Sequence, residues 1–570
     1  MLKKIHEKVT GSYKWTALSN TTLGVFMASL DASIVIISLP AIFRGINLNP
    51  LEPSNIGYLL WMLMGYMVCT AVLVVAFGRL GDMFGRVKMY NAGFLIFTIA
   101  SIALSLTPGT GGSAAMFMIV MRMVQGIGGA FLMANSTAIL TDAFPAEQRG
   151  LAMGINMIAV IAGQFIGLVV GGLLADIHWR LVFWISVPFG LFGTIWAYMK
   201  LKETGVRDRR EHDWWGNLTF ALGLIAILVG ITYGIQPYKN HVMGWTNPNV
   251  LAELIGGILL MVGFVIVENR VSAPMFNLKL FKIRAFTAGN VAALLSSIGR
   301  GGLQFMLIIW LQGIWLPLHG YSFESTPLWA GIYMLPLTFG FLIAGPLSGH
   351  LSDRHGAKYF STGGMLLGAL AFLFLMYLPA NFNYLVFSFF LFVMGIGSGL
   401  FAAPNTTAIM NSVPAKERGQ ASGMRATFMN SGQVLSIGLF FSLMILGLAN
   451  TLPRSMSANL TREGVQPALA EQIASMPPVA SLFAAFLGYN PMRQLLPESA
   501  LAALPAQNAA TITGKEFFPE LISSPFMHGL RIAFTLSLIA YLIAAFASWL
   551  RGEKYIHEEK YVRERERENS

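Results

Sequence analysis

The sequence predicts an all-α membrane protein, and three observations support that prediction. Apolar residues make up 55% of the 570 residues and charged residues only 11%, with a mean hydropathy of +0.62. A soluble domain is about one quarter charged, so this chain has too few charges to cover a globular surface in water. Apolar stretches of roughly twenty residues, enough to cross a hydrocarbon core, recur along the chain. An internal repeat, finally, divides the chain into two similar halves.

The apolar stretches predict fourteen membrane spans in order. The first follows a basic N-terminus, and we expect it to be a retained span because it is too long for a signal segment and contains Asp31. Gly and Pro interrupt several spans, which a helical bundle tolerates because neighbouring helices satisfy the freed backbone groups. The spans are expected at 18–42, 57–77, 89–106, 115–139, 151–175, 181–200, 214–235, 250–267, 285–316, 328–349, 360–378, 384–410, 420–448 and 528–550.

The repeat fixes the plan of these spans. Segment 144–150 recurs as 413–419, an offset of 269 residues, and loop 81–85 has a partner in 352–356 at an offset of 271. Parallel halves of this kind are typical of transporters. Six spans fit the first 200 residues, so the offset leaves room for two more between the halves. The predicted domains are a six-helix half at 1–200, two inserted helices with linkers at 201–284 and a second six-helix half at 285–570.

Positive charge predicts the orientation of the bundle. Lys and Arg residues gather in the even-numbered loops, which places both termini in the cytoplasm of a multi-pass protein of the cell membrane. Segment 450–525 is then a long outward loop rich in Ala, Ser and Pro, and 551–570 is a solvated cytoplasmic tail. The loop is interpreted as partly ordered, with a lid or a docking site for a periplasmic or surface partner as the alternative.

A glycine-rich basic loop between the second and third spans is the first functional motif. Its glycines permit a tight turn and close approach of helices, while its aspartate and arginines can pair with neighbouring helix ends. The second half repeats it around Asp353 and Arg354. We expect this gate loop to use Gly78, Arg79, Gly81, Asp82, Gly85 and Arg86.

These motifs resemble those of the major facilitator superfamily, and within it the fourteen-span drug:proton antiporters. The loop at 78–86 is similar to the superfamily signature that latches the cytoplasmic gate. Segment 30–35 with Leu39 and Pro40 resembles the first-helix motif, and Arg122 with 125–129 resembles the fourth-helix motif, whose arginine serves proton coupling. The resemblance implies a major facilitator fold of two six-helix halves plus two inserted helices.

The fifth span resembles the antiporter motif, which places glycines along one helix face. Leu168 stands where that motif has proline, so the kink is lost while the small-residue face remains. Small residues let helix backbones approach closely, and we expect this face to pack against the other half. The matching positions are Gly154, Gly163, Gly167, Gly171 and Gly172.

Two ionisable residues inside the spans are candidates for proton coupling. Asp31 lies about thirteen residues into the first span, roughly 20 Å along it. Burial and a nearby cation act on the pKa of a carboxyl group in opposite directions, so Asp31 can load and release a proton as access alternates. Arg122 keeps its charge and is expected to modulate that carboxyl group. The alternative for both residues is permanent structural pairing.

A substrate cavity is expected between the halves. Arg300 and Arg425 add positive charge there, which favours anionic or zwitterionic amphiphiles if both face the cavity; if they instead reach the inner membrane interface, this inference disappears. Tyr66 and other aromatic or methionine side chains would suit hydrophobic ligands. The predicted cavity residues are Asp31, Gln125, Asn156, Arg300, Gln304, Trp310 and Arg425.

The leading function is proton-coupled export of hydrophobic or amphiphilic compounds by alternating access. The sequence has no Gly-x-x-x-x-Gly-Lys-Ser/Thr phosphate loop, no dinucleotide motif after a strand and no metal-ligand spacing, so no enzyme chemistry or ATP drive is predicted. No cofactor or nucleic acid is expected; the partners are small-molecule substrate, protons and lipid, with the proton gradient as energy source. The alternatives are a transporter of a specific anionic metabolite and a non-transporting receptor or scaffold.

Overall fold

The computed structural model is an all-helical bundle in the residues that it describes, which are 2–49, 52–144, 148–203, 213–239, 241–271, 274–322, 324–414, 417–487 and 490–552. Within these residues, 14 helices are long and apolar enough to cross a membrane, so the predicted number of spans is confirmed. The first half consists of α1 (Leu2–Gly45), α2 (Pro53–Phe84), α3 (Arg86–Ser105), α4 (Gly111–Ala143), α5 (Arg149–Ile177), α6 (Leu181–Trp184) and α7 (Ser186–Lys200).

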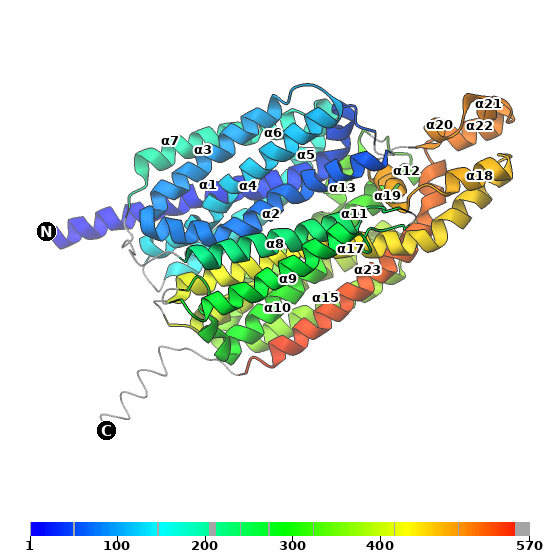
Figure 1. The fold of residues 1–570 in the computed structure, drawn as a ribbon. Coiled ribbons are helices and arrows are strands. Elements are labelled where there is room, and N and C mark those ends of the chain that lie inside the picture. The colour runs from blue at the N-terminus through cyan, green and yellow to red at the C-terminus, as the bar shows by residue number, and fades with distance from the viewer. Residues whose placement is uncertain are drawn as a thin grey trace.

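The inserted pair and the second half follow in chain order. Figure 1 shows the two halves side by side, with the inserted pair across them. The inserted pair is α8 (Trp214–Gly234) and α9 (Pro248–Glu268), and η2 (Leu278–Lys282) leads into the second half. That half consists of α10 (Arg284–Gly301), α11 (Leu303–Trp310), η3 (Leu311–Trp315), α12 (Leu316–Leu318), α13 (Thr326–Tyr333), α14 (Leu335–His355), α15 (Ala357–Tyr377), α16 (Tyr384–Asn411), α17 (Arg418–Arg462) and α23 (Phe517–Trp549).

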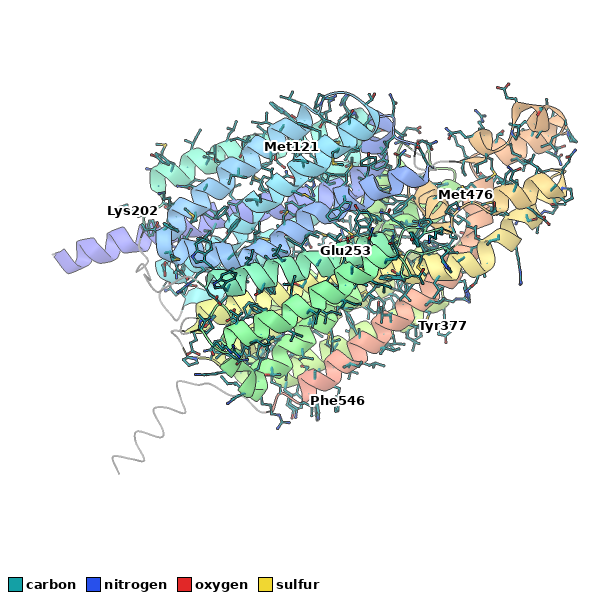
Figure 2. All side chains as sticks on the ribbon, viewed as in Figure 1. Met121, Lys202, Glu253, Tyr377, Met476 and Phe546 are labelled. Atoms are coloured by element: carbon teal, nitrogen blue, oxygen red, sulfur yellow. The ribbon has the colours of Figure 1, made fainter. Side chains whose placement is uncertain are left out.

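The bundle has two ends, which we name from the chain. The terminal end is where α1 begins and α23 finishes, and the distal end lies opposite (Figure 1). Lys202 lies at the terminal end and Met476 at the distal end, while Tyr377 and Phe546 lie on a long side of the bundle (Figure 2). Tyr377 is 70% exposed and Phe546 63% exposed. Apolar side chains this exposed along the spans form a surface suited to lipid rather than water.

Segment 450–525 differs from the predicted loop, because most of its described residues are helical. α17 continues 14 residues past the expected end of its span, to Arg462, and α23 begins at Phe517 rather than at 528. Both helices therefore project beyond the distal end (Figure 1), and we call segment 450–525 the extension. Between them lie five short helices, most of which begin directly after a proline, a residue favoured in the first helical turn. They are α18 (Pro467–Ala474), α19 (Pro478–Phe486), α20 (Met492–Leu495), α21 (Glu498–Ala502) and α22 (Ala506–Thr513).

The ninth span is broken into several pieces. α10 ends at Gly301, α11 follows, and residues Leu311–Trp315 form the π-helix η3 before α12. Pro317 has no backbone N–H to continue the α-helical ladder, so a rearranged turn just before it is expected. Irregular turns within a span are tolerated where protein surrounds them, and all five η3 residues are buried.

The two halves meet along two seams. At the distal end, α5 packs directly on α13: Gly172 lies against Leu328, and Gly331 lies against Leu168. The second seam joins α2 and α17. The inserted pair touches both halves through α8, where Thr232 donates a hydrogen bond to the Met64 sulfur at 3.5 Å. α8 therefore bridges the halves beside the second seam.

Candidate functional site

The two residues predicted for proton coupling form one network inside the first half. Asp31 on α1 is 0% exposed and Arg122 on α4 is 3% exposed, and their side chains form an ion pair. Gln125, one turn along α4, donates from Nε2 to Asp31 Oδ1 at 2.8 Å and accepts from Arg122 Nη1 at 2.5 Å. Gln125 Nε2 also lies 2.9 Å from the Ser101 hydroxyl of α3. Both carboxylate oxygens of Asp31 thus have donors.

Glycines of α5 hold the backbone of α1 on either side of this carboxylate. A methyl group on Gly163 would lie 2.5 Å from the carbonyl oxygen of Phe26. A methyl group on Gly167 would lie 2.5 Å from the carbonyl oxygen of Leu30. Only glycine permits such close backbone approach. The spacing of these glycines therefore positions Asp31 by fixing the helix that carries it.

Glycines of α4 bring α2 close to the charged network in the same way. A methyl group on Gly126 would lie 2.8 Å from the carbonyl oxygen of Tyr66, and one on Gly129 would lie 2.7 Å from the Tyr66 hydroxyl. The Tyr66 ring consequently lies under the Arg122 guanidinium, 4.6 Å from its central carbon. A cation over an aromatic face is stabilised by the ring quadrupole. Arg122 thus has three kinds of partner: the Asp31 carboxylate, the Gln125 amide and an aromatic ring.

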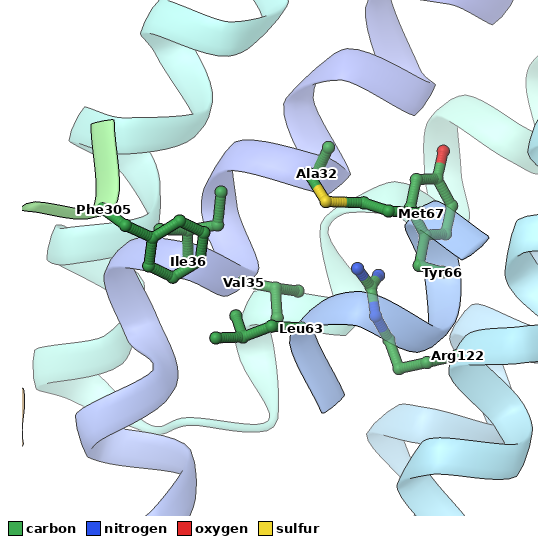
Figure 3. Close-up of a pocket in the computed structure, with 8 residues that line it drawn as sticks. All are labelled: Ala32, Val35, Ile36, Leu63, Tyr66, Met67, Arg122 and Phe305. Atoms are coloured by element: carbon green, nitrogen blue, oxygen red, sulfur yellow. The ribbon is translucent and has the colours of Figure 1, made fainter. Parts of the chain in front are cut away.

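A small pocket opens beside this network (Figure 3). Its cavity volume is about 10 Å³, room for about one water molecule, so in this conformation it is closed to a drug-sized compound. Three helices of the first half line it, and Phe305 of α11 is its single residue from the second half. The wall is apolar and aromatic apart from Arg122, so a hydrophobic ligand here would touch the same arginine that pairs with Asp31. The lining residues are Ala32, Val35, Ile36, Leu63, Tyr66, Met67, Arg122 and Phe305.

Three other predicted cavity residues have different surroundings. Trp310 is fully buried in the second half, where its indole N–H donates to the Ala380 carbonyl at 3.0 Å and its ring packs on Phe382 and Phe387. It belongs to the core of that half and does not line the pocket. Arg300 is exposed at the end of α10, and Gln304 is half-buried on α11; neither lines the pocket.

The two repeat-related positions differ as the sequence indicates. Asn156 on α5 donates to the Ser136 hydroxyl at 3.1 Å, within the first half. Arg425 on α17 has its Nη1 2.7 Å from the Met429 sulfur, while its buried Nε has no hydrogen-bond partner among the described residues. Neighbouring Gly423 faces Val75 of α2 across the second seam. Arg425 therefore lies close to the junction of the halves, toward the terminal end from the pocket.

The gate loop is organised around Arg86. Its guanidinium pairs with Asp82 at 2.7 Å and with Asp142 at the end of α4 at 2.7 Å, and its backbone N–H donates to the Glu203 carboxylate at 2.8 Å. Gly85 makes the turn with a φ of 113°, a conformation that favours glycine. Arg86 thus ties the ends of α2, α3 and α4 together within the first half.

Other gate-loop glycines permit close helix contact. Gly81 faces Asn135 on α4, and Gly78 lies near Ala134. In the second half Gly356 makes the corresponding turn with a φ of 82°. Arg354 beside it is exposed, and the side chain of Asp353 lies outside the described residues. Arg79 of the gate loop also has an interaction partner.

The fifth-span glycines serve two different contacts, which corrects the expected packing against the other half. Gly163, Gly167 and Gly171 face α1 in their own half, and Gly172 alone of the five meets the other half, at α13. Gly154 faces open space. The reason is geometric: α5 presents most of its small-residue stripe to α1 and reaches α13 only at its distal end.

Charges also meet at the distal end. Glu324, just before α13, hydrogen-bonds to its own backbone and to Ser322, and it is attracted by Arg44 of α1 and Lys515 of the extension. These interactions, its own backbone hydrogen bond first, lower the pKa of the Glu324 carboxyl group. Because Arg44 belongs to the first half and Glu324 to the second, this attraction favours closure of the distal seam.

Some site residues were not predicted. Ser101 and the pocket residues Leu63 and Phe305 carry no signal of their own, because their spans are rich in similar residues. The charged network could be found because ionisable groups are rare inside spans. Within the described residues, no group of three or more His, Cys, Asp or Glu side chains could hold a metal ion.

A family model described as Major Facilitator Superfamily matches residues 21–437. A tetracenomycin C resistance and export protein of Streptomyces glaucescens is 27% identical over 538 residues, covering 93% of this chain and 90% of its own. A multidrug transporter protein of Bacillus subtilis is 26% identical over 550 residues, covering 95% and 94%.

A solved structure resembles the fold across both halves. It is a bacterial homologue of the human lysosomal transporter Spinster, in an inward-facing and occupied conformation. It matches with a TM-score of 0.55 at 15% identity, covering 95% of this chain and 97% of that chain. The motifs, the two-half bundle and a family match over most of the sequence agree: the chain belongs to the Major Facilitator Superfamily.

Proposed function

We propose that this protein is a proton-coupled secondary transporter that exports hydrophobic or amphiphilic compounds by alternating access. The observation that carries the proposal is the contact between the buried Asp31–Arg122 pair and an apolar, aromatic pocket. Arg122 belongs to both, so a proton on Asp31 and a compound that enters the pocket once it widens act on the same guanidinium. The export named for the Streptomyces relative supports the direction.

The coupling follows from electrostatics. When Asp31 is ionised, Arg122 has its counter-charge and both carboxylate oxygens are occupied. When Asp31 binds a proton, the guanidinium loses that counter-charge while it remains buried, which is costly. Arg122 then gains from any rearrangement that offers water or another acceptor. Exchange of proton for compound at one buried arginine therefore links the two fluxes.

The proposed orientation places the terminal end in the cytoplasm and the extension outside the cell, in the plasma membrane. Basic residues near the terminal end support it, because positively charged loops remain on the cytoplasmic side. They include Arg86, Lys88, Lys200, Lys202, Arg284 and Lys358.

Proteoliposomes with an imposed pH gradient test the proposal. When a fluorescent amphiphile is added, the compartment that the compound enters is expected to lose protons. Movement of the compound and protons in the same direction would contradict antiport. Asp31→Asn should abolish gradient-driven transport because it removes the titratable carboxyl group. Glu498→Gln, at an exposed carboxylate of α21, is the matched control and should transport normally. Unchanged gradient-driven flux in Asp31→Asn would remove this residue from the mechanism.

Transport of an anionic compound is the second candidate, and Arg425 favours it. This arginine is near the junction of the halves and has a buried Nε without a partner among the described residues. An anionic substrate would supply the missing acceptor. Arg425→Ala should then weaken transport of an anionic dye more than that of a cationic dye of similar size. Equal transport of both dyes by the variant would rule this candidate out.

A further inference from the structure

The extension contains one helix that is buried rather than exposed. All nine residues of α19 are buried, although the helix is far too short to span a membrane. The sequence alone allowed this apolar patch to lie in the membrane interface. The structure instead places it inside the protein, folded back from the projecting ends of α17 and α23 (Figure 1).

The seat of α19 lies where the ninth span is irregular. α19 contacts η3, α11, α17 and α23 of the second half, and it also touches α2 of the first half. At the π-helical turn, a methyl group on Gly313 would lie 2.5 Å from the carbonyl oxygen of Ala485. The two backbones therefore touch at a glycine in a rearranged turn, a type of turn that is frequent at functional sites.

Four phenylalanines connect this seat to the pocket. Phe305 lines the pocket, and its ring centroid lies 6.4 Å from that of Phe486 and 6.1 Å from that of Phe441. Phe441 in turn lies 5.4 Å from Phe483. Phe483 and Phe486 belong to α19, so α19 supports the one pocket wall that comes from the second half. We name these four residues the aromatic seal.

The contacts of α19 suit an element that can leave its seat. They are apolar and aromatic, and such contacts have little directional requirement. The Ser481 hydroxyl is fully buried and has no hydrogen-bond partner among the described residues. A buried hydroxyl without a partner destabilises the seated helix, and that cost is recovered when water reaches it. If α19 stayed in this position permanently, alanine at position 481 would make the protein more stable than serine does.

We propose that α19 is the distal plug of the transport path and leaves its seat when the pocket opens toward the distal end. This rests on the proposed function, because the compound must then leave on that side. In the structure the plug and the Gly172–Leu328 contact close the distal end at two places, one beside α11 and one between α5 and α13. Displacement of α19 exposes Phe305 and Phe441 as the next aromatic surface that a compound meets.

Thiol labelling during transport tests the plug. In a Cys69→Ser background the chain has no other cysteine, so Ser481→Cys provides a single reporter of nearly the same size. A membrane-impermeant maleimide is applied on the distal side. Labelling should accelerate about tenfold with substrate and a pH gradient, as expected when a state populated at a few per cent becomes a major state. Ala484→Cys provides a second reporter at another fully buried position of α19.

Two control cysteines define the limits of the assay. Ala510→Cys, exposed on α22, should be labelled at all times, and Ala371→Cys, buried on α15, should stay unlabelled. Equal labelling of both α19 reporters with and without turnover would overturn the plug. Export of the compound from the same vesicles is measured separately. Export with unchanged labelling refutes the plug alone, whereas absence of export refutes the proposed function.

Loosening the seal gives an independent result. Phe486→Ala removes the ring that supports Phe305, and a cysteine at the pocket residue Val35 should then become labelled from the distal side several times faster than in the parent. Phe389→Ala, on the 59% exposed ring of α16, is the matched control and should leave that rate unchanged. Identical rates in both variants would contradict a sealing role for Phe486.

Discussion

Gly172 gives the sharpest test of how the distal end closes. A methyl group there would lie 2.5 Å from the backbone nitrogen of Leu328 and 2.8 Å from the carbonyl carbon of Pro327. Favourable contacts between such atoms need about 3.5–4.0 Å, so α5 and α13 would have to separate by about 1 Å. Backbone atoms cannot rotate away as a flexible side chain would. Gly172→Ala should therefore destabilise the closed seam rather than repack it.

The size of the Gly172→Ala effect follows from the cost of overpacking the contact between α5 and α13. Forcing an extra methyl group into a packed interface costs about 1–3 kcal/mol. If the whole cost falls on the closed arrangement, the balance shifts toward a distally open state by about 5- to 150-fold. Gly154→Ala is a matched control on the same helix, because a methyl group there would meet no atom within 4 Å.

The reporter is a single cysteine at Val35 in the Cys69→Ser background, labelled from the distal side by an impermeant maleimide. Gly172→Ala should label faster than its parent and should lose gradient-driven accumulation. Gly154→Ala should match the parent in both assays. Equal labelling of the Gly172 and Gly154 variants, with both proteins monodisperse after purification, would refute the assignment of this contact as a gate.

Three further variants probe other parts of the molecule. Gly167→Ala, whose methyl group would lie 2.5 Å from the Leu30 carbonyl oxygen, should lower thermal stability by about 1–3 kcal/mol and reduce proton-coupled flux, measured by thermal unfolding and transport. Trp310→Phe, which loses the bond to Ala380, should cost about 1–3 kcal/mol of stability but leave KM unchanged; an altered KM would place Trp310 at the substrate. The lowered pKa of Glu324 means that its contribution to distal closure is complete above the ordinary value of 4.5 and is lost as pH falls through the lowered value. Acid slows maleimide labelling of every cysteine because the thiolate reacts, so pocket labelling is expressed relative to the exposed Ala510→Cys control at the same pH. That ratio should rise in strong acid in the parent, and a Glu324→Gln variant that keeps the same rise would exclude this carboxylate.

Much of the fold could be predicted because the bilayer limits the choices. Apolar run length predicts spans directly, and the repeat around Pro145 and Pro414 predicts two halves with a pair between them. The extension was harder to predict. This segment is rich in Ala and Pro. In a sequence, a proline that starts a short helix cannot be distinguished from a proline in a loop. The order of these short helices comes from tertiary packing on α17 and α23.

The charged residues of the site could be predicted from the sequence, but the apolar residues that line the pocket could be predicted less well. Asp31, Arg122 and Gln125 are polar groups in hydrocarbon, so burial forces them to find one another. Trp310 and Phe305 are both aromatic residues of the ninth span, five residues apart; the sequence favoured Trp310, whereas Phe305 lines the pocket. Both belong to α11, and five residues turn a helix by about 500°, so their side chains lie about 140° apart and face different neighbours.

The unequal lining of the pocket bears on how a compound would be unloaded. Seven of its eight residues come from the first half and only Phe305 from the second. When the halves rock apart, a bound compound would keep nearly all of its contacts with one rigid body and lose a single ring. Little binding energy is then spent on the conformational step itself. A transporter of this kind would accept compounds of many shapes, because the second half makes almost no contact with a bound compound.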